Sequence, residues 1–389
     1  MLSTLRKPAL FRIYLIPFIT MLVSSMVWSI SIVYALELGA NIYQVNLLRS
    51  IRTLMGIILL VPIGMFSDRF GRKAMVIYSR LITLFGVLIR AFASNVNHLY
   101  IASIVGGVAD RGFFPVLLSM IGDVAEEDEK QEAVSILYLF SSIGLTIGPS
   151  ITSVLLAGET VTLRGVYKIG VIAQILVLIY LFTQTKETGI QAQNAEKIDI
   201  SNIKDLLTQP RFRYLSYMAV LYFFSRSILQ TYIPLYAKLD LGFSDGRVAL
   251  LSTYRNLGIL IIRLLSATLL TRVPFNLFLY TSLALGGVAG LTSIFANNYY
   301  TLIIALMIAG VSYGAVRILG ATDIARLSTK ENRGVANSLY NVAISSGNII
   351  RTVTAPLAEL FGIIPLFLLA TITAMASIIP VTKMKEQSN

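Results

Sequence analysis

Long apolar runs separated by short polar segments form the dominant pattern along this chain. A helix needs roughly 20 apolar residues to cross the hydrocarbon core of a bilayer, which is about 30 Å thick. Twelve runs approach that length, at about residues 11–36, 43–66, 74–94, 98–121, 132–157, 165–185, 212–237, 247–270, 274–296, 299–322, 335–358 and 361–382. The pattern therefore predicts an all-α membrane protein with twelve transmembrane helices.

A polar stretch at 186–210 contains no apolar run of spanning length and separates the helices into two groups of six. We expect residues 1–185 to form an N-terminal six-helix bundle and residues 211–389 to form a C-terminal six-helix bundle. The stretch between them is then a cytoplasmic linker. The first apolar run is too long for a cleaved signal peptide, so we interpret it as a retained membrane helix.

The composition supports a membrane location and excludes several kinds of site. Of the 389 residues, 56% are apolar and only 13% are charged, against about 25% charged in soluble domains. The chain has no cysteine, which excludes disulfides and thiolate metal sites. It also lacks a His/Cys metal cluster, a phosphate-cradling glycine loop and a nucleophile elbow. We therefore expect no metal, no cofactor and no enzymatic activity.

The positions of the cations predict the orientation. Arg69, Arg72 and Lys73 lie in a tight turn between the second and third apolar runs, which the positive-inside rule places in the cytoplasm. Counting spans from this turn puts both termini in the cytoplasm. Most of the remaining Lys and Arg fall in cytoplasmic loops or inside the spans. The net charge of +12 therefore does not indicate a nucleic-acid partner.

The two groups of helices resemble each other at an offset of about 200 residues, which indicates an internal repeat. The matched positions include Phe11-Arg12 with Phe212-Arg213, Gly39 with Gly242, Arg52 with Arg255, and Asp123 with Asp323. A parallel repeat of this kind predicts two bundles related by a pseudo-twofold axis along the membrane normal.

The turn between the second and third runs carries a recognisable motif, consisting of Gly64, Asp68, Arg69, Gly71, Arg72 and Lys73. Its spacing resembles the loop motif between helices 2 and 3 of the major facilitator superfamily. The resemblance implies two pseudo-symmetric six-helix bundles and a gating role for the turn. It further implies that Asp68 lies near the N-terminus of helix 11 and that Arg72 pairs with Asp123. An ordinary basic loop is the alternative interpretation.

The fifth apolar run contains Gly144, Gly148 and Pro149. This group resembles, in part, a helix 5 motif of drug and proton antiporters within the same superfamily. Ser135 stands where that motif has a glycine, so the match is incomplete. The glycines favour close helix packing and the proline favours a bend in the helix. Helix packing without any role in efflux is the alternative interpretation of this group.

Ten arginines fall inside predicted spans, where each costs about 2.5–3.5 kcal/mol to insert at mid-helix. They are Arg49, Arg52, Arg80, Arg90, Arg111, Arg226, Arg255, Arg263, Arg317 and Arg351. Arg49, Arg80, Arg90, Arg317 and Arg351 lie toward helix ends, where we expect them to snorkel or to pack. Arg52, Arg111, Arg226 and Arg255 lie within roughly 5 Å of mid-span and cannot snorkel easily. Arg263 is intermediate.

We expect the four deep arginines to face a watery cavity and to bind an anionic substrate, because guanidinium groups suit bidentate capture of carboxylate or phosphate. Arg52 and Arg255 are repeat-related and are expected to face each other. Polar positions at helical spacing add Gln230 and Asn341 as candidate lining residues. The resemblance, in which helices 1, 4, 7 and 10 line the cavity, favours Trp28, Arg111 and Arg226.

These features predict a secondary transporter of the cell membrane that moves a small anionic solute by alternating access, with a counter-anion or a proton as coupling ion. We expect a monomer in the lipid bilayer. The first alternative is a proton-coupled multidrug or sugar efflux antiporter with Asp110 as proton carrier. The second is a non-transporting membrane protein, such as a receptor or lipid-handling relative.

Overall fold

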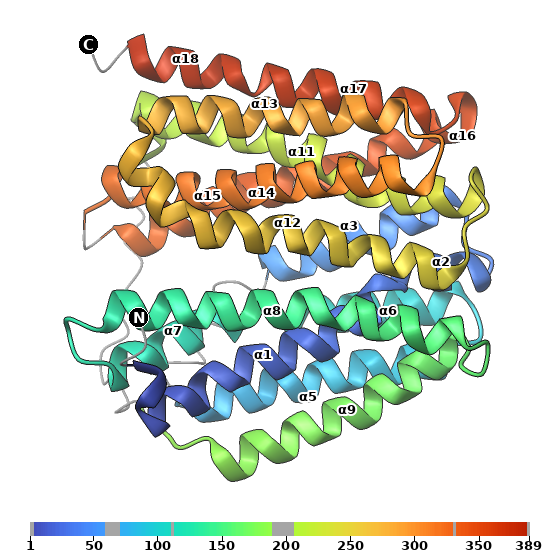
Figure 1. Cartoon of the computed structure of the whole chain (residues 1–389), viewed down its shortest axis with the longest axis horizontal. Coiled ribbons are helices and arrows are strands. Elements are labelled where there is room, and N and C mark those ends of the chain that lie inside the picture. The colour runs from blue at the N-terminus through green and yellow to red at the C-terminus, as the bar shows by residue number, and fades with distance from the viewer. Residues whose placement is uncertain (1–3, 59–70, 110–112, 189–205, 330–331, 387–389) are drawn as a thin grey trace. The chain divides into compact units, whose positions relative to one another are not determined.

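A computed structural model describes residues 4–58, 71–109, 113–188, 206–329 and 332–386 of the chain (Figure 1). Within these residues every regular element is a helix. The chain divides into two compact units. Unit 1 consists of Met1–Glu196 with Ser244–Thr253, and unit 2 of Lys197–Phe243 with Tyr254–Asn389.

The first six predicted spans coincide with helices of unit 1. These are α1 (Pro8–Ser29) with α2 (Ser31–Glu37), α3 (Ile42–Ile58), α5 (Arg72–Ala91), α6 (Val96–Ala109) with α7 (Phe113–Val124), α8 (Lys130–Ala157) and α9 (Leu163–Gln184). A short 3₁₀ helix, η1 (Thr4–Arg6), precedes α1. Residues 59–66 of the predicted span 43–66 lie outside the described residues.

The other six predicted spans coincide with the later helices. These are α11 (Pro210–Leu239), α12 (Asp245–Arg272), α13 (Phe275–Ile294), α14 (Tyr299–Leu327), α15 (Arg333–Ile350) continued by η2 (Arg351–Thr354) and α16 (Ala355–Phe361), and α17 (Ile364–Ala376) continued by α18 (Ile378–Glu386). The prediction of an all-α protein with twelve spanning segments is confirmed.

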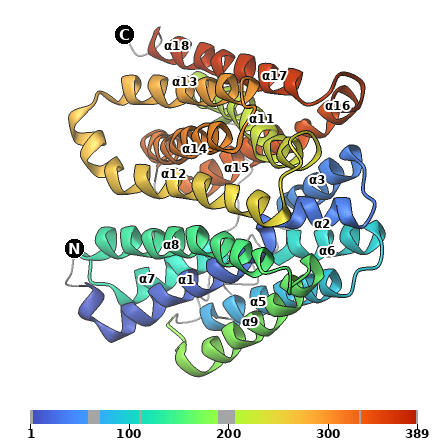
Figure 2. The ribbon, with the colours of Figure 1, turned by 45° about the vertical axis from the view of Figure 1, so that its right-hand side comes forward.

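The same packing pattern occurs in both units. In unit 1, α1 packs on α8 and α9, and α5 packs on α6 and α9. In unit 2, α11 packs on α15 and α17, and α13 packs on α14 and α17. Figure 1 and Figure 2 show α1 beside α8, and α13 beside α17. The α1–α8 contact is equivalent to the α11–α15 contact under the sequence repeat, and the α5–α9 contact is equivalent to the α13–α17 contact, so the two units share one packing pattern.

Two glycines occupy equivalent positions after the first span of each repeat. Gly39 follows α2 and Gly242 follows α11, and both have positive φ angles, of 86° and 67°. A residue with a Cβ is strained in this left-handed conformation, whereas glycine is not. The matched glycines therefore end the first span of each repeat by the same turn.

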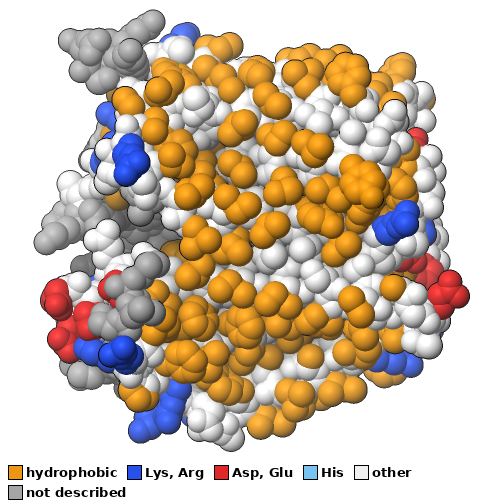
Figure 3. All heavy atoms as spheres, in the orientation of Figure 1, with side chains coloured by type: hydrophobic (Ala, Val, Ile, Leu, Met, Phe, Trp, Pro, Cys, Tyr) orange, Lys and Arg blue, Asp and Glu red, His pale blue; other side chains and the backbone are white. Residues whose placement is uncertain are grey.

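The outer surface is suited to lipid. Among the described residues, nine helices are long and apolar enough to cross a membrane. Figure 3 shows hydrophobic side chains spread over the middle of one face, with charged side chains gathered toward the helix ends. Exposed large side chains such as Val154, Phe295 and Leu360 contribute to the apolar surface. In water such exposure would be costly, but in hydrocarbon it is not.

Candidate functional site

A cavity of about 70 Å³ lies inside unit 1, where α1, α2, α3, α5 and α6 converge. The first span is interrupted here, because α1 ends at Ser29 and α2 begins at Ser31. Trp28 and Ser31 flank the interruption and line the cavity. The Ser31 hydroxyl donates to the Trp28 carbonyl at 2.8 Å. Trp28 and Ser31 are three residues apart and so lie on one face of the helix, which places an indole and a hydroxyl at the cavity wall.

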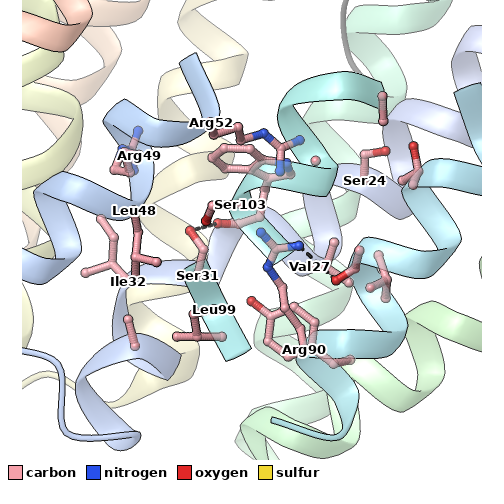
Figure 4. A pocket seen from close by; sticks show the side chains of 18 of the residues that line it. Ser24, Val27, Ser31, Ile32, Leu48, Arg49, Arg52, Arg90, Leu99 and Ser103 are labelled. Atoms are coloured by element: carbon pink, nitrogen blue, oxygen red, sulfur yellow. Dashed lines mark hydrogen bonds between the residues drawn. The ribbon is translucent and has the colours of Figure 1, made fainter. Parts of the chain in front are cut away.

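Three arginines line this cavity, as Figure 4 shows. The guanidinium carbon of Arg52 lies 4.1 Å from the centre of the Trp28 ring, and that of Arg49 lies 5.9 Å from it. Arg90 donates to the carbonyl of Gly86 at 2.9 Å and to that of Ala102 at 3.2 Å. In Figure 4, Ser31 and Ser103 lie between Arg52 and Arg90. No Asp or Glu is among the lining residues in the described part of the chain.

A second group of arginines lies in unit 2, around Tyr313 on α14. The guanidinium carbon of Arg226, on α11, lies 3.9 Å from the centre of the Tyr313 ring. Arg255 and Arg263 on α12 and Arg317 on α14 are close enough to act electrostatically on the same tyrosine. We call Arg226, Arg255, Arg263 and Arg317 the Tyr313 arginine cluster.

Three members of the cluster, Arg226, Arg255 and Arg317, contact neutral groups among the described residues. Arg255 donates to the Asn256 side-chain oxygen at 3.1 Å, and Arg317 donates to the Asn341 side-chain oxygen at 3.3 Å. Arg226 stacks on the Tyr313 ring. Amide oxygens and an aromatic face orient a guanidinium group but do not neutralise it. The cluster therefore carries a concentrated positive charge.

The structure separates the predicted substrate-binding residues into two sets. Trp28 and Arg52 belong to the unit 1 cavity, whereas Arg226, Arg255 and Asn341 belong to the unit 2 cluster. Gln230 lies four residues beyond Arg226 on α11 and is half-buried. Arg111 and the predicted proton carrier Asp110 lie outside the described residues.

The five arginines that were expected to snorkel or to pack at helix ends lie in three different surroundings. Arg49 and Arg90 line the unit 1 cavity, and Arg317 joins the Tyr313 arginine cluster. Arg80 and Arg351 do not snorkel, because their side chains are only 2% and 3% exposed. Arg80 packs over the Phe113 ring at 4.2 Å. Distance from mid-span did not reveal these roles, because it ignores which way a side chain points.

Part of the gating motif is described. Gly71, with a φ of 87°, precedes α5, which begins at Arg72. The Nε of Arg72 lies 3.5 Å from an Asp123 carboxylate oxygen, and both side chains are partly exposed. Lys73 donates through Nζ to the Phe182 carbonyl at 3.0 Å. Gly64, Asp68 and Arg69 lie outside the described residues, and the gating role of the motif stays a prediction.

Glu187 is a partner of the motif that sequence reasoning missed. Its carboxylate accepts hydrogen bonds from the backbone N–H groups of Arg72, at 2.8 Å, and Lys73, at 3.2 Å. A carboxylate at a helix N-terminus satisfies free N–H groups and interacts favourably with the helix dipole. The available signal was Gly71 itself, because a glycine before the first helical residue has no side chain to cap the helix.

Charged residues at this end of unit 1 also tie α1 to the loop before α8. Lys7 lies 2.6 Å from Glu126 and 2.7 Å from Glu129. The hydrogen bonds that the Lys7 ammonium donates to the Glu126 and Glu129 carboxylates raise the pKa of Lys7 above its ordinary value of 10.5. The hydrogen bond and charge of Lys7 lower the pKa of Glu126 below its ordinary value of 4.5.

The glycines of the helix 5 motif lie where α8 crosses α1. A Cβ at Gly144 would overlap the Phe18 carbonyl, and one at Gly148 would overlap Ser25 and the Leu22 carbonyl. Pro149 lies inside α8. The crossing is also joined by the Ser25 hydroxyl, which lies 3.3 Å from the Gly144 carbonyl. Helix packing accounts for both glycines, and their contribution to efflux stays a prediction.

Comparisons with known proteins agree on one family and one fold. The sequence model described as Major Facilitator Superfamily matches residues 13–352. Multidrug resistance protein 2 of Bacillus subtilis (strain 168) is 22% identical over 294 residues, which cover 74% of this chain and 72% of that protein. The Na(+), Li(+), K(+)/H(+) antiporter of Planococcus maritimus is 25% identical over 334 residues, 77% of each chain.

Solved structures show the same fold. The crystal structure of a POT family transporter in complex with a thioalcohol-conjugated peptide superposes with a TM-score of 0.81. The superposition covers 97% of this chain and 96% of that chain, at 12% sequence identity. At this identity the likeness describes the fold alone.

Proposed function

The chain belongs to the major facilitator superfamily of secondary transporters, as the sequence motif predicted, and on this premise we propose that it carries a small anionic solute across the cell membrane by alternating access. Each unit has its own candidate anion-binding groups, which are the arginines that line the cavity in unit 1 and the Tyr313 arginine cluster in unit 2. The multi-pass membrane location predicted from the sequence is confirmed.

The observation that carries the proposal is the positive charge that Arg226, Arg255 and Arg317 concentrate around Tyr313. Arg226, Arg255 and Arg317 have neutral partners in the described residues, and all three are only partly buried. Like charges so close together repel strongly in a low-dielectric environment. An anionic solute would relieve this repulsion and would gain charge-assisted hydrogen bonds that a neutral solute cannot make.

The unit 1 cavity supports the same class of solute. Arg49, Arg52 and Arg90 line a cavity whose wall also contains Trp28, several hydroxyl side chains and apolar side chains such as Val27 and Leu99. Guanidinium groups donate hydrogen bonds and accept none, so a ligand here must offer acceptor atoms. The serines serve as either donor or acceptor and favour oxygen-rich ligands such as carboxylates and phosphate esters.

A ligand screen tests the proposal. The purified protein is heated with carboxylates, phosphate esters, neutral sugars and organic cations, and the apparent melting temperature is recorded. We expect stabilisation by a subset of the anions, with loss of the effect in Arg52→Gln and Arg255→Gln. Arg213→Gln, which removes an exposed cation near the start of α11, serves as control and should retain it. Stabilisation by neutral or cationic compounds alone would refute the assignment to anions.

A proton-coupled efflux antiporter is the second candidate, favoured by the names of two relatives. One is called a multidrug resistance protein and the other an antiporter that exchanges alkali cations with protons. The test is proton flux in proteoliposomes that contain the wild type or Asp110→Asn. A substrate-dependent proton flux that the substitution abolishes would favour the antiporter over anion exchange.

A further inference from the structure

Two hydroxyl side chains in the wall of the unit 1 cavity are buried and yet make no hydrogen bond within the described part of the chain. Tyr167 on α9 is 1% exposed, and Ser103 on α6 is 5% exposed. Both hydroxyl oxygens keep some accessible surface, unlike the fully occluded polar atoms of the described residues that lack a partner. Since both side chains line the cavity, their hydroxyl groups open onto it.

These two hydroxyl groups lie close to positive charge. Buried polar groups in proteins are nearly always hydrogen-bonded, so two hydroxyls without a partner in one cavity wall indicate a place for the acceptor atoms of a ligand. Arg52 and Arg90 are close enough to Tyr167 to act on it electrostatically. In Figure 4, Ser103 lies between the same two arginines. Hydroxyl donors beside cations favour an anionic acceptor, such as a carboxylate.

Ser31 gives the same wall an acceptor. Its hydroxyl hydrogen is donated to the Trp28 carbonyl at 2.8 Å. A hydroxyl oxygen keeps its lone pairs when its hydrogen is donated, so while this bond is made Ser31 can only accept from a ligand. Figure 4 places Ser31, like Ser103, between Arg52 and Arg90. The cavity therefore offers donors for an anion together with an acceptor for an O–H group.

The volume and the rest of the wall restrict the ligand further. The cavity of about 70 Å³ has the space that roughly two or three water molecules occupy in the liquid. Much of its wall is apolar and includes Val27, Leu48 and Leu99. A polar group that met these side chains would lose its hydration without compensation. Sugars and nucleotides are therefore too large and too polar, and long-chain acids are too large.

We propose that the unit 1 cavity binds a short 2-hydroxycarboxylate of the size of glycolate or lactate. This inference rests on the proposed transport of an anionic solute and names the chemical class of that solute. The carboxylate accepts hydrogen bonds from the Tyr167 and Ser103 hydroxyls, beside the positive charge of the arginines. The 2-hydroxyl group donates to Ser31, and the methyl group of lactate contacts the apolar part of the wall.

Tryptophan fluorescence tests the proposal at the site itself, because Trp28 lines the cavity and is the only tryptophan in the sequence. The full-length protein in detergent is titrated with lactate, with propionate, which lacks the hydroxyl group, and with lactamide, which lacks the charge. We expect a saturable change in indole emission with lactate and none with lactamide. The apparent dissociation constant of propionate should be roughly tenfold higher than that of lactate, which corresponds to one missing hydrogen bond.

Three variants assign the contacts. Tyr167→Phe removes a donor but keeps the ring, whose centre lies 4.7 Å from that of Tyr34, and it should raise the dissociation constants of both acids roughly tenfold. Ser31→Ala should weaken the binding of lactate to the level of propionate and leave propionate unchanged. Tyr180→Phe is the matched control, because Tyr180 lies on the same helix but does not line the cavity. It should leave both dissociation constants unchanged within about twofold.

The proposal is overturned if wild type binds lactate and propionate equally, or if Tyr167→Phe and Tyr180→Phe bind lactate equally. Anions that raise the melting temperature without changing the Trp28 emission would also overturn it, because they bind elsewhere, and would leave the proposed transport of an anion intact. If no anion changes either the melting temperature or the emission, both proposals fail.

Discussion

The backbone carbonyl of Arg52 lies against Gly107, so closely that a Cβ on Gly107 would stand 2.5 Å from the carbonyl oxygen. The repeat-related residues show the same relationship, since a Cβ on Gly310 would overlap the carbonyl oxygen of Arg255. In each unit a glycine thus lets the helix that carries the deep arginine approach its neighbour. The two arginines occupy equivalent positions because the two helix crossings are equivalent.

We therefore expect Gly107→Ala to destabilise unit 1 and to disturb the cavity around Arg52. The methyl group has no room unless the helices separate, and overpacking of this kind costs about 1–3 kcal/mol. The apparent melting temperature should fall, and affinity for the stabilising anion should fall with it. The same change at Gly310 should affect the Tyr313 arginine cluster.

Gly122→Ala provides the control for this experiment. A Cβ at Gly122, also in a helix of unit 1, would meet no atom within 4 Å. Alanine there should be neutral or stabilising by roughly 0.5–1 kcal/mol, because glycine is a poor helix former. Equal melting temperatures for Gly107→Ala and Gly122→Ala would contradict the close-packing argument.

Replacing Glu187 with Gln should loosen the start of α5. The substitution removes the negative charge beside the N–H groups of Arg72 and Lys73 but keeps an oxygen that accepts hydrogen bonds, so we expect a cost of about 0.3–1 kcal/mol. Hydrogen–deuterium exchange should increase in the first turn of α5 and stay unchanged at its C-terminal end. Glu159→Gln, at the turn between α8 and α9, should have no such effect.

Tyr313 should tolerate phenylalanine but not leucine. The Phe side chain keeps the aromatic face on which Arg226 stacks, whereas Leu removes a contact worth about 0.5–2 kcal/mol. We expect Tyr313→Leu to weaken binding of the stabilising anion severalfold, as measured by thermal shift, and Tyr313→Phe to change it little. If both variants lose affinity equally, the hydroxyl rather than the ring is the group that matters.

Removing Arg211 from its ion pair with Asp323 should destabilise the protein more than removing Asp323 does. Asp323 is 2% exposed and Arg211 is 39% exposed in their side chains. Arg211→Gln leaves a buried carboxylate without its cation, which we expect to cost about 1–3 kcal/mol, less than for a fully buried pair. Asp323→Asn should cost less, since the freed Arg211 can reach solvent. The order of the two melting temperatures checks this.

The pair formed by Lys7 and Glu126 should make stability depend on pH in the acidic range. The pKa of Glu126 is lowered in the folded protein, so its contribution is present above the ordinary value of 4.5 and is lost as the pH falls through the depressed value. Wild type should therefore melt above Glu126→Gln at neutral pH, with the difference vanishing in acid. In a Lys7→Gln background the difference should be small at every pH.

The sequence alone determined the positions of the spans, the repeat, the family and the membrane location. These properties depend on the number of consecutive apolar residues and on a contiguous motif, both of which are local in the chain. The same reasoning found that arginines such as Arg52 and Arg255 lie deep in their spans. Depth along a helix follows directly from residue number.

Only the tertiary structure decided which arginines share a cavity. Arg90 was expected to lie at a helix end and lines the unit 1 cavity, whereas Arg80, on the same helix, is buried against Phe113. The two differ in direction around the α5 axis, and that direction is set by the helices that pack beside it. Glu187 likewise reaches the start of α5 through folding, because 114 residues of chain separate it from Lys73. Contacts over such distances in sequence leave no periodic signal, so only the packed helices reveal them.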